Sequence, residues 1–180
     1  NPETRGKVLA VAQEMGYTPN ALAANLRRKH SGLIALILAD MNMFFLPSVM
    51  RAVEEQVRQN GYQVIILQSN NDLAMEAQNL QICRQLSVEG ILMSLSWNTH
   101  NLNHFASIFE EKIPIIFFDK SPAEAGHGIV GIDDRATARK AVRHLIEKGH
   151  RNIFGLFGNR SLSITRDRLL GHQDALHEAG

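Results

Sequence analysis

Polar and aromatic side chains follow several short apolar runs of this sequence, at the points where predicted strands end. They are Asp40, Asn42, Phe44, Phe45, Asp119, Lys120, Asp133, Asp134 and the polar segments 69–72, 94–98 and 158–163. In parallel sheets the carboxyl ends of the strands meet at one edge, and ligands bind there. Carboxylate and amide groups hydrogen-bond hydroxyl groups, while an aromatic ring covers the apolar side of a small ligand. The set therefore predicts a site for a small polyhydroxylated molecule.

Motifs for common catalytic and cofactor chemistries are absent from the sequence. The turn after the first predicted strand, residues 40–44, contains no glycine, so it lacks the Gly-x-Gly-x-x-Gly dinucleotide pattern. The chain also has no phosphate-binding loop ending in Gly-Lys-Ser/Thr and no Gly-x-Ser-x-Gly nucleophile turn. We therefore expect no enzyme activity and no cofactor.

The histidines and acidic residues do not form an evident metal or catalytic set. His100 and His104 are four residues apart, but nothing in the predicted helix completes a ligand set, so we expect a solvated helix surface. Asp133 and Asp134 could be an acid–base pair. Without a nucleophile or a metal, a strand-end turn with a hydrogen bond to a ligand is the better interpretation. The one cysteine, Cys83, excludes an internal disulfide, suits a reducing compartment and is predicted to be a core residue.

Basic residues are concentrated at the start of the chain, although the whole chain has a net charge of only +1. The first 31 residues contain two acidic side chains and five basic ones, namely Arg5, Lys7, Arg27, Arg28 and Lys29. A basic segment on a mildly acidic body indicates a polyanionic partner for the N-terminal segment alone.

The hydrophobic pattern predicts two N-terminal helices followed by alternating strands and helices. The first helix is capped by Asn1, begins at Pro2 and ends at Gly16, while the second begins at Thr18 and is only about 10 residues long, too short to be stable alone. The remaining elements are strands at 33–39, 63–68, 90–95, 113–118, 129–132 and 153–157, and helices at 47–60, 74–86, 102–111, 136–148 and 164–179. This alternation predicts an α/β fold with a parallel sheet covered on both faces.

The chain has the composition of a soluble globular protein, with 44% hydrophobic and 21% charged residues. It contains no apolar stretch of about 18 residues and does not open with a secretory signal. It begins with Asn1 and closes in a helical pattern at Gly180, which we interpret as a fragment truncated at both ends.

A longer set of residues forms one ordered pattern along the chain. It starts with Pro2-Glu3-Thr4-Arg5-x-x-Val8-x-x-x-Ala12-x-x-x-Gly16-Tyr17-x-Pro19-Asn20-x-x-Ala23-x-x-Leu26 and continues with Asp40-x-Asn42-x-Phe44-Phe45, Gly61-Tyr62, Ser69-x-x-Asp72, Glu89-Gly90-Ile91, Ile113-Pro114, Asp119, Asp133, His144-Leu145-Ile146-x-x-Gly149-His150-Arg151 and Arg168-x-x-Gly171. In this order and spacing, the pattern resembles the lac/galactose-repressor (LacI/GalR) family of bacterial transcription regulators.

The resemblance implies four regions. Residues 1–17 would hold the last helix of a helix-turn-helix headpiece, and residues 18–31 the hinge helix and linker. Residues 32–149 would form the N-terminal effector-binding core subdomain, which is similar to periplasmic binding proteins. Residues 150–180 would begin an incomplete C-terminal core subdomain.

The resemblance also implies contacts with operator DNA by Asn1, Thr4, Tyr17, Asn20, Ala23, Leu26, Arg27 and Arg28. Asn1 and Thr4 stand at a helix N-terminus, which suits a phosphate, although helix capping is an equally good interpretation from the residues alone. Leu26 matches the family's leucine that wedges into the minor groove and kinks the duplex. Where the family often has an arginine, this chain has Ala24, and Arg27 and Arg28 could supply the charge instead.

Effector binding is implied for five residues. Phe44 and Phe45 match positions that line the family's ligand cleft, Asp119 and Arg168 match charged residues that bind polar effectors, and Asp133 is a further candidate. From the residues alone, three alternatives stay open: core packing for Phe45, an ion pair between Asp119 and a lysine, and an ion pair between Arg168 and an aspartate.

As a whole, the resemblance implies a cytoplasmic, nucleoid-associated bacterial repressor that binds an operator as a homodimer or tetramer and responds to a sugar-like effector. A periplasmic-type sugar-binding protein without DNA binding is the alternative, because it shares the core architecture. An enzyme of the same fold is the third hypothesis, for which no motif in the sequence argues. Neither a cofactor nor a metal is implied.

Overall fold

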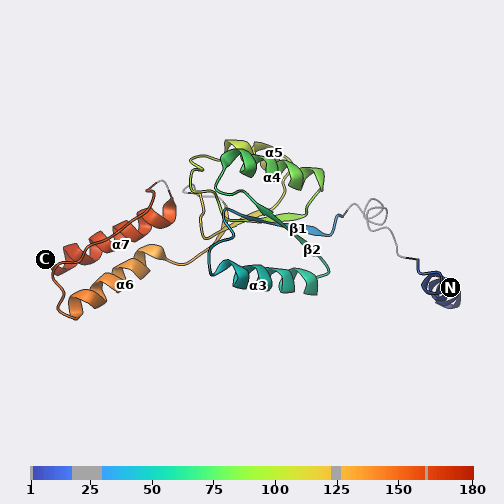
Figure 1. Cartoon of the computed structure of the whole chain (residues 1–180), viewed down its shortest axis with the longest axis horizontal. Coiled ribbons are helices and arrows are strands. Elements are labelled where there is room, and N and C mark those ends of the chain that lie inside the picture. Colours follow the sequence, from blue (N-terminus) through green and yellow to red (C-terminus); the bar gives the residue numbers. More distant parts are fainter. Residues whose placement is uncertain (1, 18–29, 123–126, 161) are drawn as a thin grey trace. The chain divides into compact units, whose positions relative to one another are not determined.

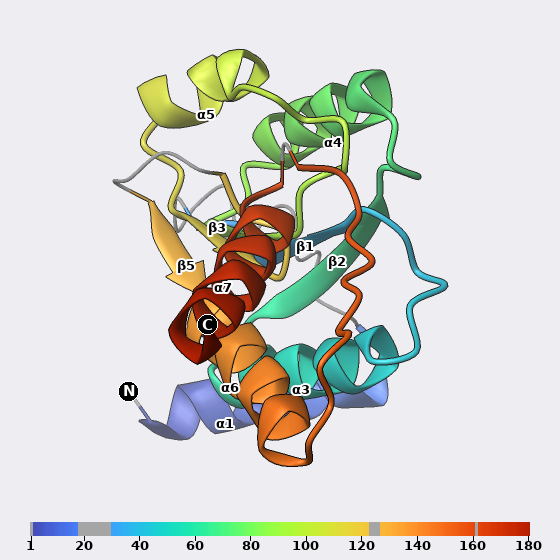
Figure 2. The same ribbon diagram turned by 90° about the vertical axis from the view of Figure 1, so that its left-hand side faces the viewer.

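The computed structural model describes residues 2–17, 30–122, 127–160 and 162–180, in two units, Asn1–Ser31 and Gly32–Gly180. In the first unit, α1 covers Pro2–Glu14 and is the helix nearest the N-terminus of the chain (labelled in Figure 2). None of its residues is buried. Gly16 follows with a left-handed φ of 63°, a conformation that ends helices, so the predicted first helix is confirmed. The predicted hinge helix falls mainly within residues 18–29, which lie outside the described residues.

The second unit contains one sheet of five parallel strands in the order β2-β1-β3-β4-β5. The strands are β1 (Leu33–Leu38), β2 (Gln63–Gln68), β3 (Gly90–Met93), β4 (Ile115–Phe118) and β5 (Gly128–Val130). Residues 35–38 of β1 have no exposed surface, which explains why this run contains no polar side chain. The parallel α/β architecture predicted from the sequence is confirmed.

Helices cover both faces of this sheet (Figure 1). The helical elements are α3 (Leu46–Gln59), α4 (Leu73–Gln85), the 3-10 turn η1 (Asn103–Phe105), α5 (Ala106–Glu110), α6 (Asp134–Glu147) and α7 (Ser163–Ala179). Leu36 and Leu38 pack in the core layer under α3, and Ala35 and Ile37 pack under α4, η1 and α5. Cys83 is buried in the second of these layers, which confirms its predicted core position.

The last two helices, α6 and α7, lie side by side (Figure 2). A Cβ atom on Gly171 of α7 would stand 2.1 Å from the carbonyl oxygen of Arg135, so only glycine allows this approach. Ion pairs lie along the contact, at 2.6 Å for Arg135–Asp174 and 2.6 Å for Arg139–Glu178. The pairing joins residues on both sides of position 149, the predicted boundary between the two core subdomains.

The predicted strand at 153–157 is wrong. These residues keep an alternating pattern, with Phe154 and Leu156 at 90% and 91% exposed and their neighbours half-buried. A strand needs a neighbouring ladder of backbone hydrogen bonds, and this segment pairs with no strand in the described part of the chain. Alternation of exposed and half-buried side chains is therefore not sufficient to predict a strand.

Among the described helices, none combines the length and the apolar character that a bilayer crossing requires.

Candidate functional site

The carboxyl ends of four strands meet at one edge of the sheet. Backbone bonds extend the ladder past the strands: the Ser69 amide donates to Leu38 (2.9 Å), the Ser94 amide to Ile37 (3.0 Å) and the Leu95 amide to the carbonyl of Lys120 (3.0 Å). These bonds bring the loops after β1, β2, β3 and β4 next to one another. The polar segments that the sequence singled out at 69–72 and 94–98, and Asp119, are thus at a common edge.

Asp119 is the charged residue at the end of β4. Its backbone has a left-handed φ of 56°, which is uncommon for a residue other than glycine and is often found at binding sites. Its carboxylate accepts a hydrogen bond from Ser94 Oγ at 3.4 Å and lies 3.4 Å from Lys120 Nζ. Lys120 also lies 4.0 Å from Met43 Sδ, so a largely buried cation stands beside the candidate carboxylate. The contact between Asp119 and Lys120 is the ion pair with a lysine that the sequence left open for Asp119.

The two neighbouring phenylalanines have different environments. Phe44 is 95% exposed, whereas Phe45 packs against the core layer of Leu36, Leu38 and Leu46 and precedes α3. Their rings meet edge to face with centroids 6.3 Å apart. Phe44 is therefore the ring available to a ligand, and Phe45 has the packing role that the sequence left open.

Asp133 and Arg168 each have a local structural partner. The Asp133 carboxylate caps α6 by accepting the Ala136 amide at 2.8 Å. Arg168 Nε donates to Asp134 at 2.7 Å, which is an ion pair of the kind considered for it, and its side chain stays half exposed. The structure does not bring either residue into contact with Asp119.

A cleft of about 260 Å³ lies beside Asp119 and the first turn of α7. Its lining consists of Asp119, Ser121, Pro122, Ile129, Gly131, Ile132, Asp134, Ser163, Ile164, Arg166 and Asp167. Ser163 Oγ donates to the carbonyl of Ser121 at 3.1 Å and closes one side. This volume is slightly below the usual range for small-molecule pockets, and the lining mixes carboxylates, hydroxyls and apolar side chains. Of the five predicted effector residues, only Asp119 lines this cleft.

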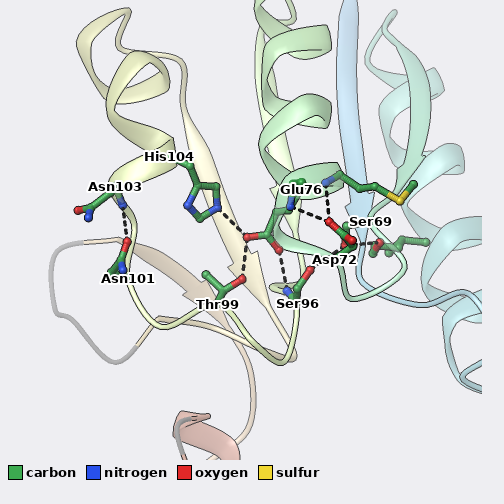
Figure 3. Close-up of polar contacts among 11 residues, drawn as sticks. Ser69, Asp72, Glu76, Ser96, Thr99, Asn101, Asn103 and His104 are labelled. Carbon is green, nitrogen blue, oxygen red and sulfur yellow. Dashed lines mark hydrogen bonds and ion pairs between the residues drawn. The ribbon is translucent and has the colours of Figure 1, made fainter.

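A buried carboxylate next to this edge was missed by the sequence analysis. Glu76 of α4 is fully buried, and three donors converge on it from the segment after β3 (Figure 3). The Ser96 amide is 2.7 Å from Oε2, while Thr99 Oγ1 and His104 Nε2 are each 2.8 Å from Oε1. Burial by itself would raise the pKa of Glu76, but the hydrogen bonds from His104, Ser96 and Thr99 outweigh it and hold the pKa below its ordinary value.

His104 therefore corrects one expectation. It was predicted to lie on a solvated helix surface, but its side chain is only 14% exposed because it is bonded to Glu76. The partner lies 28 residues away, so helical spacing around His104 gave no sign of it. Across the described ranges, His, Cys, Asp and Glu side chains form no group of three suited to a metal ion.

The predicted DNA contacts are mostly outside the described residues. Asn1, Asn20, Ala23, Leu26, Arg27 and Arg28 belong to that set. The other two, Thr4 on α1 and Tyr17 just after it, are exposed, with Tyr17 at 66%. Both side chains are thus open to a partner.

Comparison with known proteins agrees with this architecture. Residues 31–180 match the family described as periplasmic binding proteins and sugar binding domain of LacI family. The chain is 32% identical over 99% of its length to the HTH-type transcriptional regulator DegA of Bacillus subtilis, covering 53% of that protein. It is 31% identical over 98% of its length to the HTH-type transcriptional repressor PurR of Salmonella paratyphi B, covering 52% of that protein.

A solved structure is similar as well. The crystal structure of a putative ribose operon repressor from Burkholderia thailandensis superposes with a TM-score of 0.77 at 27% identity, over 84% of this chain and 57% of that one. The chain spans about half the length of the curated relatives that it matches. From the matched family and the parallel-sheet core together, the chain belongs to the LacI family, through its sugar-binding domain.

Proposed function

We propose that this protein is a sequence-specific transcription regulator, acting as a repressor in the bacterial cytoplasm, whose operator affinity is set by a small sugar-like effector. The observation that carries the proposal is the polar edge of the sheet, where Asp119 and its neighbours line a cleft in a LacI-family sugar-binding domain. Relatives named as a transcriptional regulator and a repressor support the same assignment.

The proposed effector contacts are hydrogen bonds from hydroxyl groups to Asp119 and packing of Phe44 on the apolar side of the ligand. Asp133 and Arg168 have structural partners in this chain, so they contribute if the ligand displaces those partners or binds next to them. Phe45 acts by supporting Phe44.

The proposed DNA contacts come from the basic N-terminal segment. Asn1, Thr4, Tyr17 and Asn20 would contact the phosphate backbone, as would Arg27 and Arg28, while Ala23 and Leu26 would enter the minor groove as part of a hinge helix. Two such helices from a homodimer, or from each dimer of a tetramer, would bend the operator by wedging Leu26 between base pairs.

Regulation would follow from a population shift. An effector bound between the two core subdomains favours one relative orientation of the subdomains and so one spacing of the two hinges. The hinge helix is too short to be stable alone, so whether it folds depends on that spacing. Operator affinity changes accordingly. Induction and corepression differ only in which orientation the effector favours.

The decisive experiment is a salt titration of DNA binding by the full-length gene product, using its own upstream region and a scrambled duplex. A steep fall of log affinity with log salt, with a preference of at least about 10³ for the native duplex, supports a sequence-specific regulator. Weak, sequence-blind binding by the full-length protein would contradict the proposal and favour a sugar-binding protein without DNA binding.

A further inference from the structure

The segment that joins β3 to η1, residues 94–102, is unusual for a loop because much of it is buried. We call it the β3 loop. Ser94, Ser96 and Thr99 have less than a tenth of their surface exposed, although residues 94–102 form neither helix nor strand. Buried polar backbone outside regular structure needs specific partners, since water is excluded from it. The partners therefore identify what fixes this loop.

Glu76 is the main partner. Its two carboxylate oxygens together accept the Ser96 amide, the Thr99 hydroxyl and His104, which covers the loop from its third residue to the start of η1. A buried carboxylate carries a large desolvation cost unless several donors compensate it. An apolar side chain would pack on this face of α4 at no such cost, so the carboxylate at position 76 is explained by the loop that it holds (Figure 3).

Further bonds join the same loop to its surroundings. Ser69 Oγ, at the end of β2, lies 2.9 Å from Ser96 Oγ. The backbone of Trp97 is held on both sides: its amide donates to Asn71 Oδ1 at 3.2 Å, and its carbonyl accepts from Asn159 Nδ2 at 3.2 Å. Trp97 as a whole residue is 55% exposed. The loop is thus rigidly held at its backbone, while its one tryptophan side chain stays accessible.

We propose that Glu76 is a positioning residue for the effector site: its buried carboxylate fixes the β3 loop at the carboxyl edge of the sheet, in the form in which Ser94 meets Asp119 and Trp97 reaches the surface. The loop fixation stands on the hydrogen bonds alone, and its consequence for the effector rests on the proposed function. Glu76 does not itself touch the ligand. It acts through the residues that it holds.

Amide hydrogen exchange on the unliganded 180-residue chain tests the loop fixation. In Glu76→Gln, one acceptor oxygen is replaced by a donor, so exchange at the Ser96 and Trp97 amides should rise about 10- to 100-fold. Amides of Leu36 and Ile37 in β1 should change by less than about 3-fold. Glu110→Gln, an exposed glutamate on α5, is the matched control and should leave all four amides unchanged.

A second readout uses the only tryptophan of the chain. Acrylamide quenching of Trp97 fluorescence should increase in Glu76→Gln but not in Glu110→Gln. Thr99→Val, which loses one donor with little change of shape, should show a smaller increase in the same direction, and Thr99→Ser should restore the wild-type value. If Glu76→Gln does not fold, the comparison of Thr99→Val with Thr99→Ser tests the loop fixation in its place.

Two results would overturn the proposal: unchanged exchange at Ser96 in a folded Glu76→Gln, or an equal rise at Ser96 and in β1, which would mean global destabilisation. With the full-length protein, Glu76→Gln should weaken the response of operator binding to the active sugar at least 10-fold without changing operator affinity in its absence. A wild-type protein that responds to no sugar and binds no operator contradicts the proposed function, whereas the exchange result judges Glu76 independently.

Discussion

At the scale of single residues, the edge of the sheet is shaped by two carboxylates with opposite surroundings. Asp119 stands at the rim of a cleft with a strained backbone, where it can meet a ligand. Glu76, on α4, is fully buried, so its carboxylate contacts only other protein groups. The sequence indicated Asp119 because it ends an apolar run. It could not indicate Glu76, because the three donors that explain this residue lie 20 to 28 positions further along the chain.

The left-handed backbone at Asp119 predicts a difference between two substitutions. Asp119→Asn and Asp119→Val both remove the carboxylate and the contact with Lys120, but asparagine tolerates a φ of 56° while a β-branched residue does not. The valine variant should therefore be less stable than the asparagine variant by about 1–2 kcal/mol in urea unfolding. Equal stability of the two variants would show that this backbone conformation relaxes at no cost.

Acid titration gives a second residue-scale prediction, for Glu76. Its pKa in the folded chain is lowered from 4.5, so the unfolded state binds more protons below that pH and folding becomes weaker as the pH falls through the folded value. The stabilisation is complete above pH 4.5. Wild type should lose stability faster than Glu76→Gln on acidification in this window, by at most about 1.4 kcal/mol per pH unit. Parallel curves in pH-dependent urea unfolding would contradict a lowered pKa at this residue.

At the scale of elements, most of the fold was predictable from periodicity and helix-ending glycines. The β2 strand runs from Gln63 to Gln68 as predicted, α4 differs from its prediction by one residue at each end, and α7 begins one residue earlier than predicted. The strand predicted at 153–157 is wrong because periodicity does not report on strand pairing. Alternating side chains specify which way residues face, but a strand exists only if a neighbour completes its hydrogen bonds, and that neighbour cannot be read from the segment itself.

The α6–α7 contact predicts a large effect of a small substitution. Gly171→Ala places a methyl group 2.1 Å from the Arg135 carbonyl oxygen, which is backbone and cannot turn away, so the helices must separate. We expect a loss of about 1–3 kcal/mol and a lower Tm. Gly131→Ala is the matched control, because an added Cβ there meets nothing within 4 Å. The helix contact would prove unimportant if both variants melted like wild type.

At the scale of the whole molecule, the chain joins a core of the LacI-family sugar-binding domain type to a basic N-terminal segment. The sheet and its helices account for a cleft of about 260 Å³, and this cleft gives no reason for the concentration of arginine and lysine in the first 31 residues. The nucleic-acid partner that we propose would account for that concentration, since neutralising phosphates requires cations gathered on one segment. The two properties together are what a ligand-controlled regulator needs, and neither one suffices alone.

The proposed hinge contains charged residues and an apolar wedge, and their substitutions should change the salt dependence of operator affinity differently. If Arg27 and Arg28 neutralise phosphates, replacing both with glutamine in the full-length protein should reduce the slope of log affinity against log salt by about 2. If Leu26 is an apolar wedge, Leu26→Ala should lower affinity for the native operator and leave that slope unchanged, because no counterion is involved. Arg58 is an exposed arginine on α3, outside the basic N-terminal segment, and serves as the control. Arg58→Gln should change neither the operator affinity nor the salt slope. A slope that falls with Leu26→Ala, or that persists without both arginines, would mean that this segment does not bind DNA as a charged hinge with a central wedge.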